Sequence, residues 1–265
     1  MLVNKEGKRM RILSWNVNGI RAVERSGFLE WLYRELPDIL CVQETKAQPE
    51  QLNRELSQPP GYHTYWSYPE KKGYSGVAIF TKEKPLDIHY DLASEGFDVE
   101  GRIITLEYPG FTLLNVYFPN GKKDEERLKY KLDFYELALD FVERIKIKND
   151  RLIICGDFNT AHKEIDLANP KSHENTSGFL PVERAWMDKL VAHGYIDTFR
   201  HFNKEPNQYT WWDLKSRARE RNVGWRLDYF FITEDLLQSV SKAFIMPEVM
   251  GSDHCPVGII LKTAK

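Results

Sequence analysis

Apolar runs alternate with amphipathic stretches along the chain. Continuous apolar positions predict buried strands over 11–17 and 38–42. Between them, an apolar stripe at helical spacing predicts a helix over 28–36, which ends before a proline. A strand–helix–strand unit therefore opens the chain, and a short helix with proline in its first turn is expected over 49–56.

The rest of the chain is richer in strands. Strands are predicted over 62–68, 76–81, 102–107, 111–118, 209–212, 226–232, 243–246 and 257–261, and another begins at Leu152. Helices are predicted over 124–146 and 181–193, separated by a polar loop over 163–177. The turn sequence Tyr108-Pro109-Gly110 marks a hairpin. A hairpin and an excess of strands favour an α/β fold with mixed sheets, and the lack of a linker favours one domain.

Composition narrows the class of protein. The 265 residues are 42% hydrophobic and 29% charged, an ordinary balance for a soluble globular domain. No apolar run approaches the roughly 20 residues that span a bilayer, so no membrane association is expected. Residues 1–10 are polar and lack the apolar core of a signal peptide, so a cytoplasmic location is expected.

Cysteines and charge exclude further classes. Cys41, Cys155 and Cys255 form no CxxC pair, so a zinc site and a disulfide framework are disfavoured and buried free thiols are expected. The net charge is −2, so a site for a polyanion must come from local basic patches. Candidate patches are residues 71–72, 122–123 and 217–221.

Asp157 and Asn159 follow the apolar run from Leu152, where Gly156 is expected to turn the chain. An extended backbone would point both side chains the same way, toward a water, a metal or a phosphate oxygen. The alternative is a strand that simply ends in an Asx-turn. This segment alone leaves both interpretations open.

Several other predicted strands end in polar residues, which is where α/β proteins usually place their sites. These residues are Asn16, Asn18, Gln43, Glu44, Tyr117, Asp228, Asp253 and His254. Carboxylates without cysteine suit Mg²⁺ or Mn²⁺, and a histidine beside an acid suits a polarised imidazole. Together they describe phosphodiester cleavage. Asp228 lies in an apolar strand and needs a partner, for which His254, Arg226 and a backbone donor are the alternatives.

The segments that carry these residues resemble the exonuclease III-type apurinic/apyrimidinic endonucleases, within the DNase I-like metal phosphodiesterases. The matching motifs are residues 14–22 (SWNVNGIRA), 41–46 (CVQETK), 72–77 (KGYSGV), 156–159 (GDFN), 222–229 (NVGWRLDY) and 251–256 (GSDHCP). The resemblance implies a four-layer α/β sandwich, with two mixed sheets face to face and helices outside. It covers residues 11–265 as a single catalytic domain, which leaves 1–10 as a short N-terminal extension.

The resemblance also implies roles for individual residues. Glu44 is the expected principal metal ligand, with Asn18 nearby and Asp253 assisting a second metal position. Asp157, beside Asn159, would orient or deprotonate the attacking water. His254, oriented by Asp228, would contact the scissile phosphate, and further phosphate contacts would come from Asn16, Tyr117 and Asn222. Glu164 and Asp166 resemble polar framework positions.

Substrate contacts are implied in the same way. Trp211, Trp225 and Leu227 match a pocket that accepts an extruded abasic sugar, whereas Trp212 is expected to be core packing. The positions that match residues gripping the duplex are Arg21, Gly73, Tyr74, Lys123, Lys215 and Arg217. Phosphate contacts of this kind position a protein without reading sequence.

The expected function is therefore Mg²⁺-dependent cleavage of double-stranded DNA on the 5′ side of an abasic site by a monomer. The products would be a 3′-hydroxyl and a 5′-deoxyribose phosphate, and 3′-end processing or 3′→5′ exonuclease activity is also implied. One alternative is another phosphodiesterase of this fold, such as a non-specific nuclease, an RNA deadenylase or an inositol or sphingolipid phosphodiesterase. Another is an inactive nucleic-acid-binding module, which would be expected to lose Glu44, Asp157 or His254.

Overall fold

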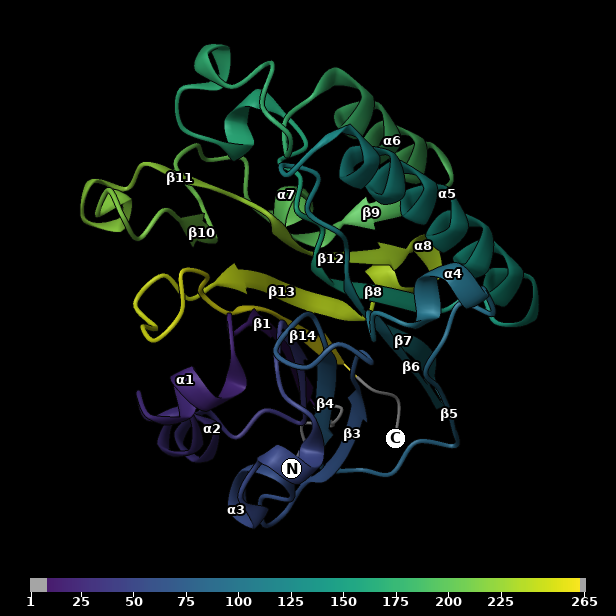
Figure 1. Ribbon diagram of the computed structural model, residues 1–265. Helices are drawn as coiled ribbons and strands as arrows, with labels where there is room; N and C mark the ends of the chain where they lie inside the picture. The colour runs from purple at the N-terminus through teal and green to yellow at the C-terminus, as the bar shows by residue number, and fades with distance from the viewer. Residues whose placement is uncertain (1–8, 263–265) are drawn as a thin grey trace, which may run out of the picture.

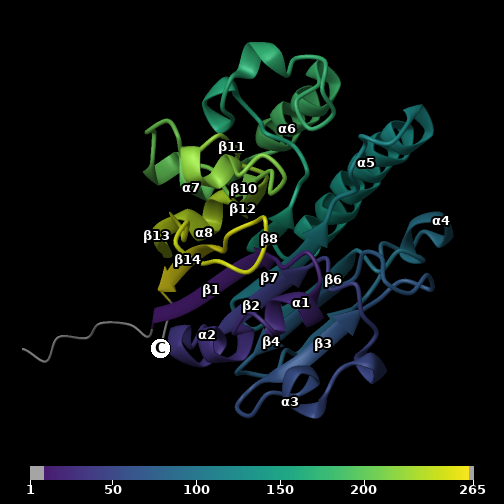
Figure 2. The ribbon, with the colours of Figure 1, turned by 60° about the vertical axis from the view of Figure 1, so that its left-hand side comes forward.

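Two mixed β-sheets lie face to face in the computed structural model, which describes residues 9–262 (Figures 1 and 2). Helices cover the outer face of each sheet, so the predicted four-layer sandwich is confirmed. Residues 1–8 of the expected N-terminal extension lie outside the described range, whereas Arg9 and Met10 already belong to the first strand. Within residues 9–262, no helix is both long and apolar enough to cross a bilayer.

The first sheet has six strands in the order β13-β14-β1-β2-β4-β3. Their bounds are Val240–Ile245, Val257–Lys262, Arg9–Asn16, Ile39–Gln43, Val77–Thr81 and His63–Ser67. Only β1 and β2 pair in parallel within this sheet, because α1 (Ile20–Glu24) and α2 (Phe28–Glu35) connect them by a crossover.

The second sheet has six strands in the order β5-β6-β7-β8-β12-β9. Their bounds are Asp87–His89, Ile103–Tyr108, Phe111–Tyr117, Leu152–Asp157, Asp228–Thr233 and Tyr195–Asp197. β7 and β8 are parallel and are joined by the long helix α5 (Glu125–Lys148). The side chain of Asp124 caps this helix by accepting a hydrogen bond from the backbone N–H of Arg127. A separate two-stranded hairpin pairs β10 (Trp211–Trp212) with β11 (Gly224–Trp225).

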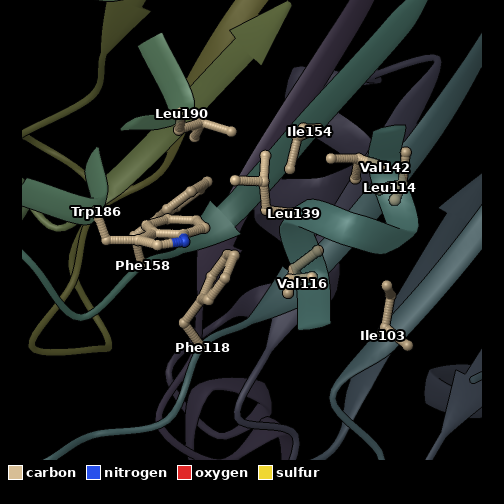
Figure 3. Close-up of a pocket in the computed structure, with 11 residues that line it drawn as sticks. Ile103, Leu114, Val116, Phe118, Leu139, Val142, Ile154, Phe158, Trp186 and Leu190 are labelled. Atoms are coloured by element: carbon tan, nitrogen blue, oxygen red, sulfur yellow. The ribbon is translucent and has the colours of Figure 1, made fainter. Parts of the chain in front are cut away.

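Three apolar layers hold the fold together. The layer between the sheets takes residues from both, including Ile12, Cys41 and Ile153. α1, α2 and α3 (Arg54–Ser57) cover the first sheet, and α5 and α6 (Pro181–Ala192) cover the second (Figure 1). Figure 3 shows the side chains of α5, α6 and the second sheet around a gap of about 10 Å³. The lining is apolar except for the buried indole N–H of Trp186, so a water would find too few polar partners there.

A polar link crosses the layer between the sheets. The amide of Asn115 in β7 donates to the carbonyl oxygens of Val42 and Ala78 in the first sheet, at 3.1 and 3.0 Å. In addition, the side-chain amide of Gln43 in the first sheet donates to the Asn115 side-chain oxygen at 2.7 Å. Buried amides of this kind fix how the two sheets sit relative to each other, because each would lose its partners if one sheet slid.

The structure corrects the expected role of Gly156. β8 runs through Gly156 to Asp157 without turning. The backbone φ of Gly156 is 137°, and a Cβ there would lie 1.9 Å from the carbonyl oxygen of Val116 on the parallel neighbour β7. Glycine is therefore required by the close approach of two strands.

Short elements account for the other differences. The helix expected over 49–56 is a 3₁₀ turn (Pro49–Gln51) followed by α3, because Asn53 starts a new helix by capping the N–H of Leu56. Sequence patterning also missed α1, β5, α4 (Glu95–Asp98), β9, α7 (Thr198–Phe202), β11 and α8 (Glu234–Leu237). All three cysteines are buried and free, as expected.

Candidate active site

Strand ends from both sheets meet at one cleft of about 340 Å³. In the second sheet, Tyr117 and Asp228 are the register partners of Asp157 on the two neighbouring strands. Paired residues of adjacent strands point to the same face of a sheet, so the three side chains project toward the first sheet. There, Asn16 ends β1, and His254 lies just before β14, the antiparallel neighbour of β1.

Most of the sequence-predicted site residues line this cleft. Those that do are Asn16, Asn18, Glu44, Tyr74, Tyr117, Asp157, Asn159, Trp211, Leu227, Asp253 and His254. The spatial convergence expected of Glu44, Asp157 and His254 is therefore present in the structure.

Asp157 is held by amide groups on both of its oxygens. Oδ1 accepts the backbone N–H of Asn159 at 2.8 Å, and Oδ2 accepts the side-chain amide of Asn16 at 2.8 Å. The side-chain amide of Asn159 also reaches Oδ2, at 3.2 Å. The Asx-turn and the shared polar site, which the sequence left as alternatives, are thus both present. Asn159 has a φ of 50°, so the turn and not an extended backbone brings it beside Asp157.

His254 is the partner of Asp228. Nδ1 of the imidazole lies 2.8 Å from Oδ2 of Asp228, and Nε2 lies 3.9 Å from Oδ2 of Asp157. Both carboxylates are almost fully buried, and His254 is 5% exposed. Asp228 therefore fixes the orientation of the ring and leaves Nε2 facing Asp157 and the cleft.

Two carboxylates around one imidazole shift the pKa values of this cluster. Burial lowers the pKa of His254, but Asp228 and Asp157 outweigh it and raise that pKa from 6.5 to about 10. Burial raises the pKa of Asp157 from 3.8 to about 7, an effect that His254 opposes and Asp228 increases. The cluster thus contains a protonated imidazolium and a carboxylate that titrates near neutral pH, the properties of a proton-transfer site.

Glu44 also lines the cleft, in a left-handed conformation with a φ of 54°. Its carboxylate accepts a hydrogen bond from the Tyr117 hydroxyl and lies 3.4 Å from Nζ of Lys46. Burial and the Glu44 carboxylate raise the pKa of Tyr117, so its hydroxyl stays protonated and acts as a donor. A non-glycine residue held at positive φ is strained, and such strain is concentrated at functional sites.

The residues expected to hold a metal offer only oxygen ligands. The side-chain amide of Asn18 donates to Asp253 at 2.9 Å, while its Oδ1 accepts from Lys46 at 2.5 Å. The Lys46 ammonium therefore already places a cation between the oxygens of Asn18 and Glu44. An all-oxygen donor set that attracts a cation fits a hard divalent ion better than zinc or copper.

A second possible donor set is formed by two residues that line the cleft and one that lies behind it. One ligand atom from each of Asp157, Asp228 and His254 lies within 4.8 Å of the others, a spacing that could hold a metal ion. The close contact between His254 and Asp228 is a hydrogen bond, which favours the acid–base interpretation of these three residues. A surface group of Asp87, His89 and Glu107 has similar spacing but does not line the cleft.

An aromatic corner adjoins the polar wall. The rings of Trp211 and Trp225 meet edge to face across the β10–β11 hairpin, with centroids 6.4 Å apart. Leu227 packs in the same apolar cluster as both tryptophans. Trp211 also donates its indole N–H to Asp253 at 3.0 Å, which ties this corner to the predicted metal wall. Trp212, in contrast, is 2% exposed, as expected for core packing.

Several predicted residues do not line the cleft. Asp228 lies behind His254, and Trp225 lies behind Trp211 and Leu227. Asn222 uses its side-chain oxygen to accept from Trp212 and its amide to donate to the carbonyl of Asn207, so neither group is directed to the cleft. The remaining positions outside the cleft lining are Arg21, Gly73, Lys123, Lys215 and Arg217. All of them are solvent-exposed, as expected for residues that would contact a large ligand.

The cleft also contains residues that the sequence did not single out for the site. They are Lys46, Arg102, Asn120, Lys122 and Arg127. Asn120 donates to the Asn159 side chain at 3.0 Å, and the guanidinium groups of Arg102 and Arg127 reach the Tyr74 hydroxyl at 3.1 and 2.6 Å. One feature of the sequence could have indicated Asn120. This residue follows Tyr117-Phe118-Pro119 at the end of a predicted strand.

Asp166 and Arg226 form a separate framework behind the site. Nε of Arg226 lies 2.8 Å from Asp166, and Nη2 lies 2.6 Å from Asp197. Arg200 also contacts Asp166, at 2.8 Å. The framework role expected of Asp166 agrees with this geometry, and Arg226 is occupied and does not pair with Asp228.

Comparisons with known proteins agree with the fold. Residues 13–254 match the model of the Endonuclease/Exonuclease/phosphatase family. The chain is 44% identical to an exodeoxyribonuclease of Bacillus subtilis (strain 168), over 95% of this chain and 99% of that protein. It is 42% identical to the DNA repair nuclease APEX1 of Danio rerio, over 98% of this chain and 85% of that protein.

A solved structure of an AP endonuclease from Archaeoglobus fulgidus matches with a TM-score of 0.87 and 30% identity, over 96% of this chain and all of that one. The family match covers nearly the whole chain. The two sequence relatives and the solved structure also align with nearly the whole chain. The chain therefore belongs to the endonuclease/exonuclease/phosphatase family.

Proposed function

We propose that this protein is a Mg²⁺-dependent DNA repair endonuclease that hydrolyses the phosphodiester bond on the 5′ side of an abasic site. The products would be a 3′-hydroxyl and a 5′-deoxyribose phosphate, with 3′-end processing at the same cleft. The observation that carries the proposal is the meeting of Glu44, Asp157 and His254 in one cleft, next to the aromatic corner of Trp211 and Leu227. The relatives of this protein include an exodeoxyribonuclease and a DNA repair nuclease.

In this proposal, Asp157 positions and deprotonates the attacking water. Its two oxygens are fixed by Asn16 and Asn159, so the carboxylate cannot rotate away from the cleft. A pKa of about 7 makes it a base that is ionised near neutral pH and still has proton affinity. His254, which its high pKa keeps protonated, would direct Nε2–H at a phosphate oxygen and stabilise the charge that develops there.

The family is metal-dependent, and the oxygens of Glu44, Asn18 and Asp253 would hold the ion in this chain. A bound Mg²⁺ polarises the phosphate and stabilises the leaving oxygen. Asn18 is neutral, so Glu44 and Asp253 are the only carboxylates among the three, and modest affinity for the ion is expected. The Tyr117 hydroxyl keeps Glu44 in place.

Two features support double-stranded DNA with an abasic site as the substrate. The cleft shares Tyr74, Asn120, Lys122 and Arg127 with an adjoining groove of about 820 Å³, which Lys71 and Lys123 also line. Basic side chains along a groove suit a phosphate backbone, although the whole chain has a net charge of −2. The aromatic corner is apolar and suits a sugar without a base, which leaves the helix at low energetic cost.

The test uses a labelled duplex that carries one tetrahydrofuran abasic analogue, with uracil-containing and intact duplexes of the same sequence as controls. We expect one Mg²⁺-dependent nick directly 5′ of the analogue, with a 3′ end that a DNA polymerase extends. Equal cutting of the intact duplex would instead indicate a non-specific nuclease. Binding that persists in EDTA without a nick in Mg²⁺ would indicate an inactive binding module. Analytical ultracentrifugation of the same sample tests the proposed monomeric state.

A further inference from the structure

Lys122 occupies an unusual place in the cleft. It lies in the connection between β7 and α5 and lines the cleft together with Trp211 and Leu227. Its Nζ is 5.0 Å from the ring centroid of Trp211 and 5.5 Å from that of Trp225. The amine is therefore directed at the aromatic corner and lies within reach of a small group seated there.

Three other lysines in or near the cleft have anionic or polar partners, whereas in the described part of the chain the Lys122 amine, like that of Lys71 in the adjoining groove, contacts only aromatic rings. Lys46 contacts Glu44 and Asn18, Lys123 pairs with Asp124, and the buried Lys131 pairs with Glu183 at 2.7 Å. Within residues 9–262, no acceptor lies within hydrogen-bond distance of the Lys122 amine and no carboxylate forms an ion pair with it. Its described ring contacts are with two indole faces.

The Lys122 side chain is exposed to solvent and the two indole faces favour its charged form, but desolvation in the cleft acts in the opposite direction. Desolvation lowers the pKa of the Lys122 ammonium, and the more distant charges of Glu183, Asp157 and Asp213 oppose the shift without cancelling it. A lower pKa increases the fraction of neutral amine at neutral pH, and only the neutral amine is a nucleophile. Lysines in partly apolar sites are for this reason the usual residues that form imines with carbonyl substrates.

An abasic deoxyribose is a carbonyl substrate. Its ring form is a hemiacetal, which opens to an aldehyde at C1′. We propose that Lys122 forms a reversible imine with the C1′ aldehyde of an abasic site seated against Trp211 and Leu227, an inference that rests on the proposed function.

The step balances without an oxidant or reductant. The nitrogen lone pair of Lys122 attacks C1′, and a proton moves from nitrogen to oxygen to give a carbinolamine. Loss of the C1′ oxygen as water then leaves a carbon–nitrogen double bond. Hydrolysis reverses the step, so the imine holds the damaged sugar in the cleft without consuming the enzyme.

Hydrolysis of the phosphodiester bond and formation of the imine use different groups, so the two can be measured separately. Imine formation needs the aldehyde and Lys122 but no metal. Hydrolysis needs Asp157, His254 and the metal but no aldehyde. A tetrahydrofuran analogue, which has no aldehyde, is therefore a substrate for incision and not for imine formation.

The experiment traps the imine by reduction. The full-length protein is mixed with a duplex that carries a natural abasic site in EDTA, and sodium borohydride is added to convert an imine into a stable secondary amine. We expect a covalent protein–DNA adduct whose attachment site maps to Lys122 by peptide mass spectrometry. The tetrahydrofuran duplex should give no adduct, and Lys122→Arg should lower the adduct yield by about tenfold or more, because a guanidinium is not a nucleophile.

Lys129→Arg is the matched control, because Lys129 is exposed on α5, pairs with Asp133 and does not line the cleft. It should give the wild-type adduct yield. Wild-type adduct yield from Lys122→Arg, attachment at another lysine, or no adduct from the wild type would each overturn the proposal. Mapping of the wild-type adduct decides the question even if Lys122→Arg does not fold.

Parallel incision assays in Mg²⁺ separate this inference from the proposed function. Incision of both abasic duplexes without an adduct would refute the imine and leave the endonuclease standing. Failure to incise either duplex in Mg²⁺ would refute the proposed function itself.

Discussion

Two buried clusters of charged side chains lie side by side at the start of β12, and they differ in their balance of charge. Around Arg226, the carboxylates of Asp166 and Asp197 face two guanidinium groups, those of Arg226 and Arg200. Two residues further along the chain, Asp228 and its strand partner Asp157 share the single imidazole of His254. In the first cluster, two guanidinium groups balance the charge of two carboxylates, so we call it compensated. The second, uncompensated cluster has two carboxylates and only one imidazole.

The pKa values show what this difference does. Burial raises the pKa of Asp166, but Arg226 and Arg200 outweigh burial and hold that pKa below 3.8. The pKa of Asp157 rises to about 7, because burial is only partly offset by His254. A compensated cluster keeps its protons fixed over the physiological range and stabilises the fold. An uncompensated one can exchange a proton near pH 7, which is what a hydrolytic site needs.

The largest effect should come from breaking the compensated cluster. We expect Arg226→Met to lower the free energy of unfolding by about 3–5 kcal/mol, because Asp166 and Asp197 lose a buried partner. Urea unfolding followed by circular dichroism measures this change. This large decrease in the free energy of unfolding should be accompanied by only a small decrease in the incision rate per folded molecule. A variant of wild-type stability would show that the cluster does not hold the fold.

A smaller effect is expected from Asp228→Asn, which removes charge from the uncompensated cluster. The single-turnover rate of incision should fall by about 10²-fold, because His254 loses its orienting carboxylate and much of its positive charge at neutral pH. The pKa of His254 in the metal-free protein should fall from about 10 toward its ordinary value. Nitrogen-15 NMR of the imidazole measures that pKa, and an unchanged value would contradict the assigned pairing.

The smallest effect is a difference in pH dependence, with opposite signs for the two clusters. Asp166 has a lowered pKa, so its stabilisation is present above about pH 4 and is lost as pH falls through its folded pKa. Asp157 has a raised pKa, so its ionisation removes stability as pH rises from about 4 through about 7. Asp166→Asn should therefore destabilise the protein at pH 7 by about 1–3 kcal/mol, and this loss should begin to shrink only below about pH 4, as pH falls toward the folded pKa of Asp166.

Asp157→Asn should be at least as stable as the wild type at pH 7. Urea unfolding of both variants between pH 3.5 and pH 8 tests the two signs together. If the free energy of unfolding depended on pH in the same way for both variants, the clusters would not differ in the way proposed.

The sequence predicted the strands of the core well, because continuous apolar runs leave little choice of structure. It also placed Asp157 correctly at the end of a strand, whereas Asp228 begins β12 and His254 lies just before β14. The family resemblance is confirmed. The register that pairs Asp157 with Asp228 depends on long-range strand pairing, which no local pattern encodes.

Residues in turns were the hardest to predict. Lys46, Asn120 and Lys122 lie in short polar segments after strands, and at the level of local pattern such segments look like any solvated turn, although residues 122–123 were a candidate basic patch. Asn222 shows the reverse problem. Its motif is present, but a left-handed backbone with a φ of 49° directs its side chain to Trp212 and away from the cleft.

The most direct test of the account is the single-turnover incision rate of Asp157→Asn on an abasic duplex in Mg²⁺, with Asp166→Asn measured beside it at the same concentration of folded protein. Both substitutions replace a buried carboxylate by its amide, so only the cluster differs. We expect Asp157→Asn to lose about 10³-fold or more in rate while it still binds the duplex, and Asp166→Asn to cut at close to the wild-type rate. Near-normal turnover by Asp157→Asn would contradict the account.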